Sequence, residues 1–120
     1  MALLPHQHDH KSQQVFEHIP REAAFQNVAQ LFHQLGDGPR IRIFWILCHC
    51  EECVINLSAM MEMSSPAVSH HLRQLKEADL IISRREGKEV YYKAADTDVA
   101  KMLHAMIEDL LTISCPIQPK

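Results

Sequence analysis

Apolar residues recur at helical spacing in several separate stretches of this 120-residue chain. The first run extends from Phe25 to Leu35 and stops at Gly36, which predicts an amphipathic helix starting near Arg21. The next four residues, GDGP, predict a loop, and Pro39 is well placed to open another helix. Residues 41–47, IRIFWIL, fit a buried strand by their β-branched content. We interpret them instead as a buried helix, because no partner strand of similar length is nearby.

A second helical pair follows in the middle of the chain. Residues 57–63 have a short helical pattern, and SSPAVSHHLRQLKEADL begins at Ser64. Ser65 is the predicted N-cap, with Pro66 at the first helical position. Val68, Leu72 and Leu75 form one narrow apolar stripe, so the opposite face is expected to point outward. That outward face carries Pro66, Ser69, His70, Arg73 and Gln74.

The spacing then changes twice. LIISRREGKEVYYKA, residues 80–94, alternates about Glu86 and Gly87 and predicts a β-hairpin with a charged tip. Apolar residues between Val99 and Ile113 predict a long amphipathic helix. This helix has more apolar surface than a domain this small can easily cover alone.

This order of elements defines the expected fold class. It is a mainly α (α+β) winged helix-turn-helix with about five helices and a β-hairpin wing. We expect a flexible histidine-rich arm over residues 1–20, the winged domain over 21–116 and a tail over 117–120. An α+β domain with an ordinary solvated helix and hairpin is the simpler alternative.

Composition narrows the function classes. The chain is 47% hydrophobic, which suits one compact domain, and it has neither a membrane-spanning run nor a signal peptide. Four cysteines without a secretion signal favour a reducing cytoplasm. The net charge of −3 neither supports nor excludes binding to nucleic acid. Residues 64–93, however, are the only stretch in which basic residues outnumber acidic ones. A polyanion is therefore expected to bind there.

The predicted helix from residue 65 suits the reading of base edges in the major groove of double-stranded DNA, because Arg73 matches guanine and Gln74 adenine. Serines near its start and the hairpin tip suit phosphates. The candidate DNA-binding residues are Ser64, Ser65, Ser69, His70, Arg73, Gln74, Arg84, Arg85 and Lys88. Only three glycines are present and no oxyanion loop or phosphate cradle appears, so we expect neither an enzyme nor an organic cofactor.

The same stretch resembles the ArsR/SmtB family of bacterial metal-responsive repressors. The matching pattern is Ser69-His70-His71-Leu72, then Arg85-Glu86-Gly87-Lys88 and Tyr91-Tyr92, and the likeness extends over residues 21–113. It implies a homodimer, joined through the first and last helices, that binds an operator palindrome. An inducer would release the repressor from that operator.

The resemblance also suggests where the inducer binds. Family members that sense cadmium, lead or arsenic resemble Cys-Val-Cys-Asp-Leu, where this chain has Cys53-Val54-Ile55-Asn56-Leu57. Cys48 and Cys50 are candidates for the missing thiolates, provided that the helix unwinds near residues 49–52. Three thiolates suit arsenite, cadmium or lead, and an added histidine suits zinc. The arm histidines His6, His8 and His10 are further candidate ligands, or belong to a disordered polar tail.

Other interpretations of these residues remain open. Some family members resemble a redox-active cysteine pair, for which Cys48 and Cys115 are the candidates here. Glu51 and Glu52 would raise thiol pKa values and disfavour a reactive thiolate. A family site on the last helix matches poorly, because its histidines are missing here and His104 is out of step with the pattern. Asp96, Asp98, His104 and Asp109 could still hold a harder metal ion. The cysteines could also be incidental thiols, and the module could bind DNA without an inducer.

Overall fold

The computed structural model describes residues 2–114, and the chain divides into two compact units, Met1–Gln30 and Leu31–Lys120. The first unit contains helix α1 (His10–Glu17) and most of α2 (Glu22–Gln34). The Asp9 side chain caps α1 by accepting a hydrogen bond from the Ser12 amide at 2.9 Å. The expected arm therefore contains a capped helix, and α2 confirms the first predicted amphipathic helix.

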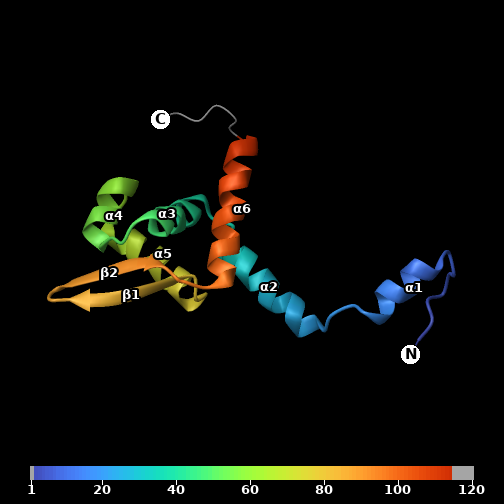
Figure 1. The fold of residues 1–120 in the computed structure, drawn as a ribbon. Helices are drawn as coiled ribbons and strands as arrows, with labels where there is room; N and C mark the ends of the chain where they lie inside the picture. The colour runs from blue at the N-terminus through green and yellow to red at the C-terminus, as the bar shows by residue number, and fades with distance from the viewer. Residues whose placement is uncertain (1, 115–120) are drawn as a thin grey trace. The chain divides into compact units, whose positions relative to one another are not determined.

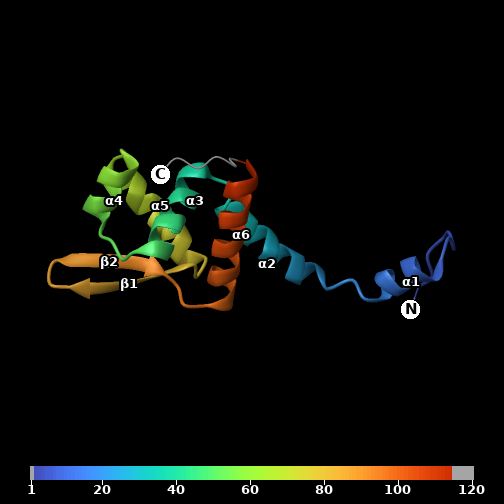
Figure 2. The same cartoon turned by 45° about the horizontal axis from the view of Figure 1, so that its top comes forward.

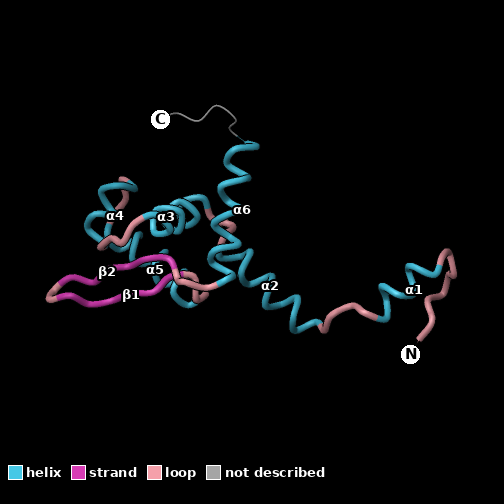
Figure 3. Tube along the Cα trace, viewed as in Figure 1, coloured by secondary structure: helices cyan, strands magenta, loops and turns pink. Residues whose placement is uncertain are grey.

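The second unit has the predicted order of elements (Figures 1 and 3). Residues 41–47 are helical, so the choice of helix over strand is confirmed. The short helix begins at Val54, three residues before the predicted start at Leu57. The elements are α3 (Gly38–His49), α4 (Val54–Met61), α5 (Ser65–Glu77), β1 (Ile81–Glu86), β2 (Glu89–Ala94) and α6 (Asp98–Ser114).

The start of α5 differs by one residue from the prediction. Ser64, not Ser65, is the N-cap, with an extended backbone and a side chain that accepts a hydrogen bond from the Ala67 amide at 3.3 Å. Pro66 is then the second helical residue, where its missing N–H costs nothing because first-turn amides have no intrahelical partner. Ser65 instead pairs its hydroxyl with that of Ser58 on α4, at 3.1 Å.

Strands β1 and β2 form the predicted antiparallel hairpin. Glu86 pairs with Glu89, so the two turn residues are Gly87 and Lys88, one position beyond the predicted turn. Gly87 has φ +64°, a conformation that glycine adopts without steric cost, and it is the positive first turn residue that type II′ hairpins require. The hairpin projects away from the helices as a wing (Figures 1 and 2).

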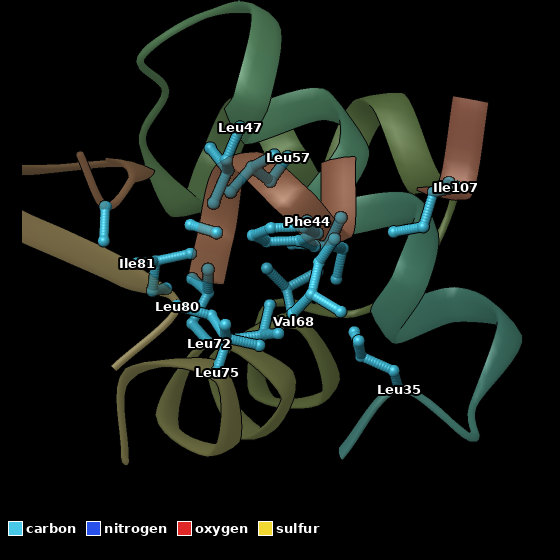
Figure 4. Packing of buried hydrophobic residues seen from close by; sticks show 14 of the residues in the cluster. Leu35, Phe44, Leu47, Leu57, Val68, Leu72, Leu75, Leu80, Ile81 and Ile107 are labelled. Atoms are coloured by element: carbon cyan, nitrogen blue, oxygen red, sulfur yellow. The ribbon is translucent and has the colours of Figure 1, made fainter. Parts of the chain in front are cut away.

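A single apolar core holds the second unit together (Figure 4). Phe44 and Ile43 of α3 are fully buried, and Leu57 of α4 packs into the same cluster. The predicted stripe on α5 is buried as well, which fixes the opposite, polar face of that helix toward solvent. The remaining large members of this core are Leu35, Leu47, Met61, Val68, Leu72, Leu75, Leu80, Ile81, Leu103 and Ile107.

Helix α6 buries only one of its apolar faces. Ala100, Leu103 and Ile107 point into the core, while Met102 is 68% exposed and Ile113 is 75% exposed. No helix within residues 2–114 is long and apolar enough to cross a bilayer. The exposed apolar residues of α6 are Val99, Met102, Met106, Leu110, Leu111 and Ile113.

Candidate DNA interface and sensing segment

The outward face of α5 has the polar composition that its sequence predicts. His70 and Arg73 are exposed, and Ser69 and Gln74 are half-buried. His71 behaves differently: its side chain is only 12% exposed, and its Nδ1 accepts a hydrogen bond from Nε of Arg40 at 3.3 Å. Burial lowers the pKa of His71, so this histidine is a neutral link between α3 and α5 at neutral pH.

The wing offers fewer free cations than its sequence suggests. Arg84 donates to both carboxylate oxygens of Glu51, at 2.7 and 2.9 Å, and to Glu86 at 2.6 Å. Its guanidinium also lies 4.8 Å from the centre of the Tyr91 ring. These two carboxylates raise the pKa of Arg84 further and neutralise its charge locally. Arg85 and Lys88 are exposed near the hairpin tip.

The sensing segment, residues 48–53, spans the junction between α3 and α4. Helix α3 ends at His49, Cys50 is its extended C-cap, and Cys53 is the N-cap of α4. The chain is therefore not helical between residues 50 and 53, as convergence of the three thiols requires. Yet Cys48, Cys50 and Cys53 do not form a group whose sulfurs all lie within 4.8 Å of one another. Ile55, which replaces the second family cysteine, is 67% exposed.

The environments of the thiols differ. Cys48 is half-buried, and its burial together with the negative charge of Glu108 raises the pKa of this thiol to about 11. Cys50 is exposed and donates to the Ile46 carbonyl at 3.5 Å. Partial burial and then Glu52 raise the pKa of Cys50 as well. Both effects favour the protonated thiol, so metal binding would have to displace these protons.

The sensing segment is joined directly to the wing. The amide of Glu52 donates to the Tyr92 carbonyl at 3.0 Å, and the amide of Tyr92 donates to the Glu52 carbonyl at 2.8 Å. This isolated antiparallel bridge places residue 52 beside β2 like a one-residue third strand. The Glu51–Arg84 ion pair adds a side-chain link to β1. Residues 51 and 52 therefore tie this segment to both strands of the hairpin.

A further polar group, which sequence reasoning missed, joins the C-terminal end of α3 to α6. Nε2 of His49 and Nε2 of His104 each lie 3.0–3.1 Å from Oε1 of Glu108. The two Nε2 atoms are 3.1 Å apart, and Trp45 Nε1 donates to the same carboxylate oxygen at 3.2 Å. In the sequence, only the i, i+4 spacing of His104 and Glu108 indicated that these two side chains would meet. His49, their partner on α3, lies 55 residues before His104.

The remaining candidates have no shared site within the part of the chain that the structure describes. His6 and His8 stack with their ring centres 5.6 Å apart, and His10 opens α1. Asp96 pairs with Lys101 at 2.9 Å, so it belongs to a surface ion pair and not to a ligand group with His104. Cys115, the suggested redox partner of Cys48, lies outside the described residues.

A helix-turn-helix pair followed by a hairpin wing defines the class of winged helix-turn-helix regulators. The model of the bacterial regulatory protein family arsR matches residues 37–83, which contain α3, α4, α5 and the start of β1.

Individual relatives extend this match. A transcriptional repressor SmtB homolog from Synechocystis sp. is 39% identical over 85 residues, covering 71% of this chain and 64% of that protein. A cadmium resistance transcriptional regulatory protein CadC homolog from Staphylococcus aureus is 37% identical over 87 residues, covering 69% of this chain and 72% of that protein. The structure of reduced HlyU from Vibrio cholerae superposes with a TM-score of 0.65 at 31% sequence identity, covering 78% of this chain and 95% of HlyU. The chain belongs to the arsR family.

Proposed function

We propose that the protein is a homodimeric transcriptional repressor that binds operator DNA and is released by a soft metal ion or metalloid at the sensing segment. The proposal rests on one observation: residue 52 of this segment exchanges two backbone hydrogen bonds with Tyr92 of the wing. Ligand binding at the thiols would move the backbone that these bonds hold. Names of relatives that refer to cadmium and arsenic resistance support the choice of inducer class.

In the proposed complex, α5 lies in the major groove. Arg73 and Gln74 would contact base edges, because their planar groups form paired hydrogen bonds with guanine and adenine. Ser64, Ser65, Ser69 and His70 would lie near phosphates around the start of the helix. Arg85 and Lys88 would contact phosphates from the wing. Arg84 is paired with Glu51, so we propose that it holds the wing to the sensing segment and contributes less to phosphate binding than Arg85 does.

The exposed apolar face of α6 supports a second copy of this chain as partner. Met102, Leu110 and Ile113 are each more than half exposed, and such a continuous apolar face is rarely left in water. A two-fold dimer would present two α5 helices to successive major grooves on one side of the duplex. The family and the reduced thiols suit a cytoplasmic regulator that is not an enzyme.

The inducer would bring together thiols that do not form a close group in this structure. Cys53 and Cys50 flank the non-helical residues, so their sulfurs can approach by local backbone change without breaking α3. Cys48 is on the last turn of α3 and is held less freely. Closing this segment around an ion would pull residue 52 away from Tyr92 or twist the hairpin. Because coupling is reciprocal, operator DNA would weaken inducer binding by the same factor.

Reduced protein titrated with zinc, cadmium, lead and arsenite, with thiolate-to-metal absorbance recorded, tests the proposed inducer class. Saturable absorbance that is lost in Cys50→Ser and Cys53→Ser, and kept in Cys115→Ser, is the expected result. Absence of absorbance for all four ligands, with a Cys48–Cys115 bond after mild oxidation, would instead favour a redox sensor. The raised pKa of Cys48 argues against such a reactive thiolate.

A further inference from the structure

We propose that His49, His104 and Glu108 form a binding site for a divalent first-row transition metal ion, separate from the thiols. Within residues 2–114 they form the one group of three His, Cys, Asp or Glu side chains whose ligand atoms all lie within 4.8 Å of one another. The site would join the C-terminal end of α3 to the middle of α6. It does not depend on the inducer proposed for the cysteines.

The distances suit a common ion. The three ligand atoms form a nearly equilateral triangle with edges of 3.0–3.1 Å. Ligands about 2.1 Å from one ion are separated by about 3.0 Å on an octahedral face and about 3.4 Å on a tetrahedral face. The triangle therefore fits one face of an octahedral site as it stands, and a tetrahedral site after a shift of a few tenths of an ångström.

The two imidazoles and Glu108 can be paired in more than one way. If both Nε2 atoms carry protons, both donate to Oε1 of Glu108, and the 3.1 Å contact between the two Nε2 atoms is not a hydrogen bond. If either Nε2 is unprotonated, its lone pair faces the lone pairs of Glu108 Oε1. A cation in front of the triangle removes the conflict, because both imidazoles can be neutral and direct their Nε2 lone pairs at it.

The charge of the site also favours a cation. Burial acts to raise the pKa of Glu108, but hydrogen bonds from His104, His49 and Trp45 outweigh it, and the net pKa is lowered. The carboxylate is therefore ionised at neutral pH and supplies one full negative charge. Trp45 donates to the carboxylate from α3 at 3.2 Å and would orient it as an outer-shell partner.

The donor set and the exposure define the class of ion. Two imidazoles and one carboxylate suit zinc, cobalt or nickel, while calcium and magnesium prefer oxygen ligands only. The side chains of His49 and Glu108 are each 44% exposed and that of His104 is 30% exposed. Water can therefore fill the remaining coordination positions, and the ion can exchange with solvent.

Trp45 gives this site its own optical signal. It is the only tryptophan of the chain, it donates to Glu108, and its ring centre lies 4.4 Å from that of His49. A paramagnetic ion bound to His49 would quench its fluorescence.

The test is a titration of full-length reduced protein with cobalt(II), followed by both Trp45 fluorescence and visible absorption. We expect saturable quenching at one ion per chain, reversed by zinc, with cobalt d–d bands and no thiolate-to-cobalt charge-transfer band at that first equivalent. Replacement of His6, His8 and His10 by glutamine should leave this quenching unchanged.

The ligand variants give the specific comparison. His49→Gln, His104→Gln and Glu108→Gln should each weaken the cobalt affinity by more than about tenfold, whereas His33→Gln, on exposed α2, should not change it. Far-UV circular dichroism verifies that each variant is folded, and all three ligand side chains are exposed enough for substitution. Equal affinity in His104→Gln, or a first equivalent that gives only a thiolate band with unchanged fluorescence, would overturn the proposed site. Release of DNA by metals at the thiols is a separate measurement, so either proposal can fail alone.

Discussion

Arg84 on the wing and Glu51 in the sensing segment form a two-bond ion pair, with N–O distances of 2.7 and 2.9 Å. The Arg84 hydrogen bonds lower the pKa of Glu51, so the pair is fully charged at neutral pH. Arginine holds carboxylates well in this paired geometry. The guanidinium therefore serves the connection between the sensing segment and the wing, and is poorly available to a phosphate.

The two neighbouring arginines of β1 should consequently differ in DNA binding. Arg85→Ala should lower the affinity for every duplex sequence and reduce the slope of log K against log salt by about 0.9, the value for one lost phosphate contact. Arg84→Ala should change that slope by clearly less. Fluorescence anisotropy of a labelled duplex at several salt concentrations measures both. Equal slopes for the two variants would contradict the assigned role of Arg84.

The polar face of α5 should carry the sequence specificity. Arg73→Ala and Gln74→Ala should each cost about 1–3 kcal/mol on a duplex selected by the wild-type protein from a random library. The same variants should bind a scrambled duplex almost as well as wild type does. Arg42→Ala, which removes an exposed arginine from α3, is the matched control and should leave both affinities unchanged. A similar loss on both duplexes would indicate a backbone contact and not base reading.

The exposed apolar face of α6 should hold the dimer together. Met102→Glu and Leu110→Glu place a charge in that face. We expect each to weaken the dimer and raise its dissociation constant at least about tenfold. Lys101→Gln, on the same helix, should leave the dimer intact. Sedimentation equilibrium measures the association. A wild-type protein that remains monomeric at micromolar concentration would refute the proposed interface directly.

The Cys48 thiol should be slow to react. With a pKa of about 11, only about one molecule in a thousand carries a Cys48 thiolate at pH 8. Alkylation by iodoacetamide, followed by mass spectrometry of the Cys48 peptide in the presence of a chelator, should accelerate about tenfold per pH unit up to pH 10. Glu108→Gln removes a negative charge that raises this pKa, so it should speed the reaction. A rate that already levels off between about pH 9 and 10 would show an unperturbed thiol.

Local patterns predicted most of the fold. Helical and alternating spacing located every element from α2 to α6, because each buries one face against a common core. Helix α4 begins three residues before its predicted start. The other errors were single-residue offsets at the α5 N-cap and at the hairpin turn. Ser64 and Ser65 were equally suitable as the N-cap of α5, and the contact of Ser65 with Ser58 decided between them. The position of the hairpin turn was decided by the register of β1 and β2.

The site was less predictable, because its contacts join residues far apart in the sequence. Nothing local indicated that Arg84 would meet Glu51, 33 positions earlier, or that His49 would face His104. Both pairings depend on how α3 packs beside the wing and α6. The sequence correctly marked residues 48–53 as the junction before the helix-turn-helix pair. It did not reveal that residue 52 would bond to β2.

Operator release by an inducer is the most direct test of the account. A labelled duplex selected by the reduced protein is bound to saturation, and anisotropy is followed while cadmium, lead or arsenite is added. We expect at least one of these to lower the DNA affinity of wild type more than tenfold, and to have little effect on the Cys50→Ser, Cys53→Ser double variant. Thiol-bound metal with unchanged DNA affinity, or equal release of wild type and double variant, would contradict the proposed coupling from the sensing segment to the wing.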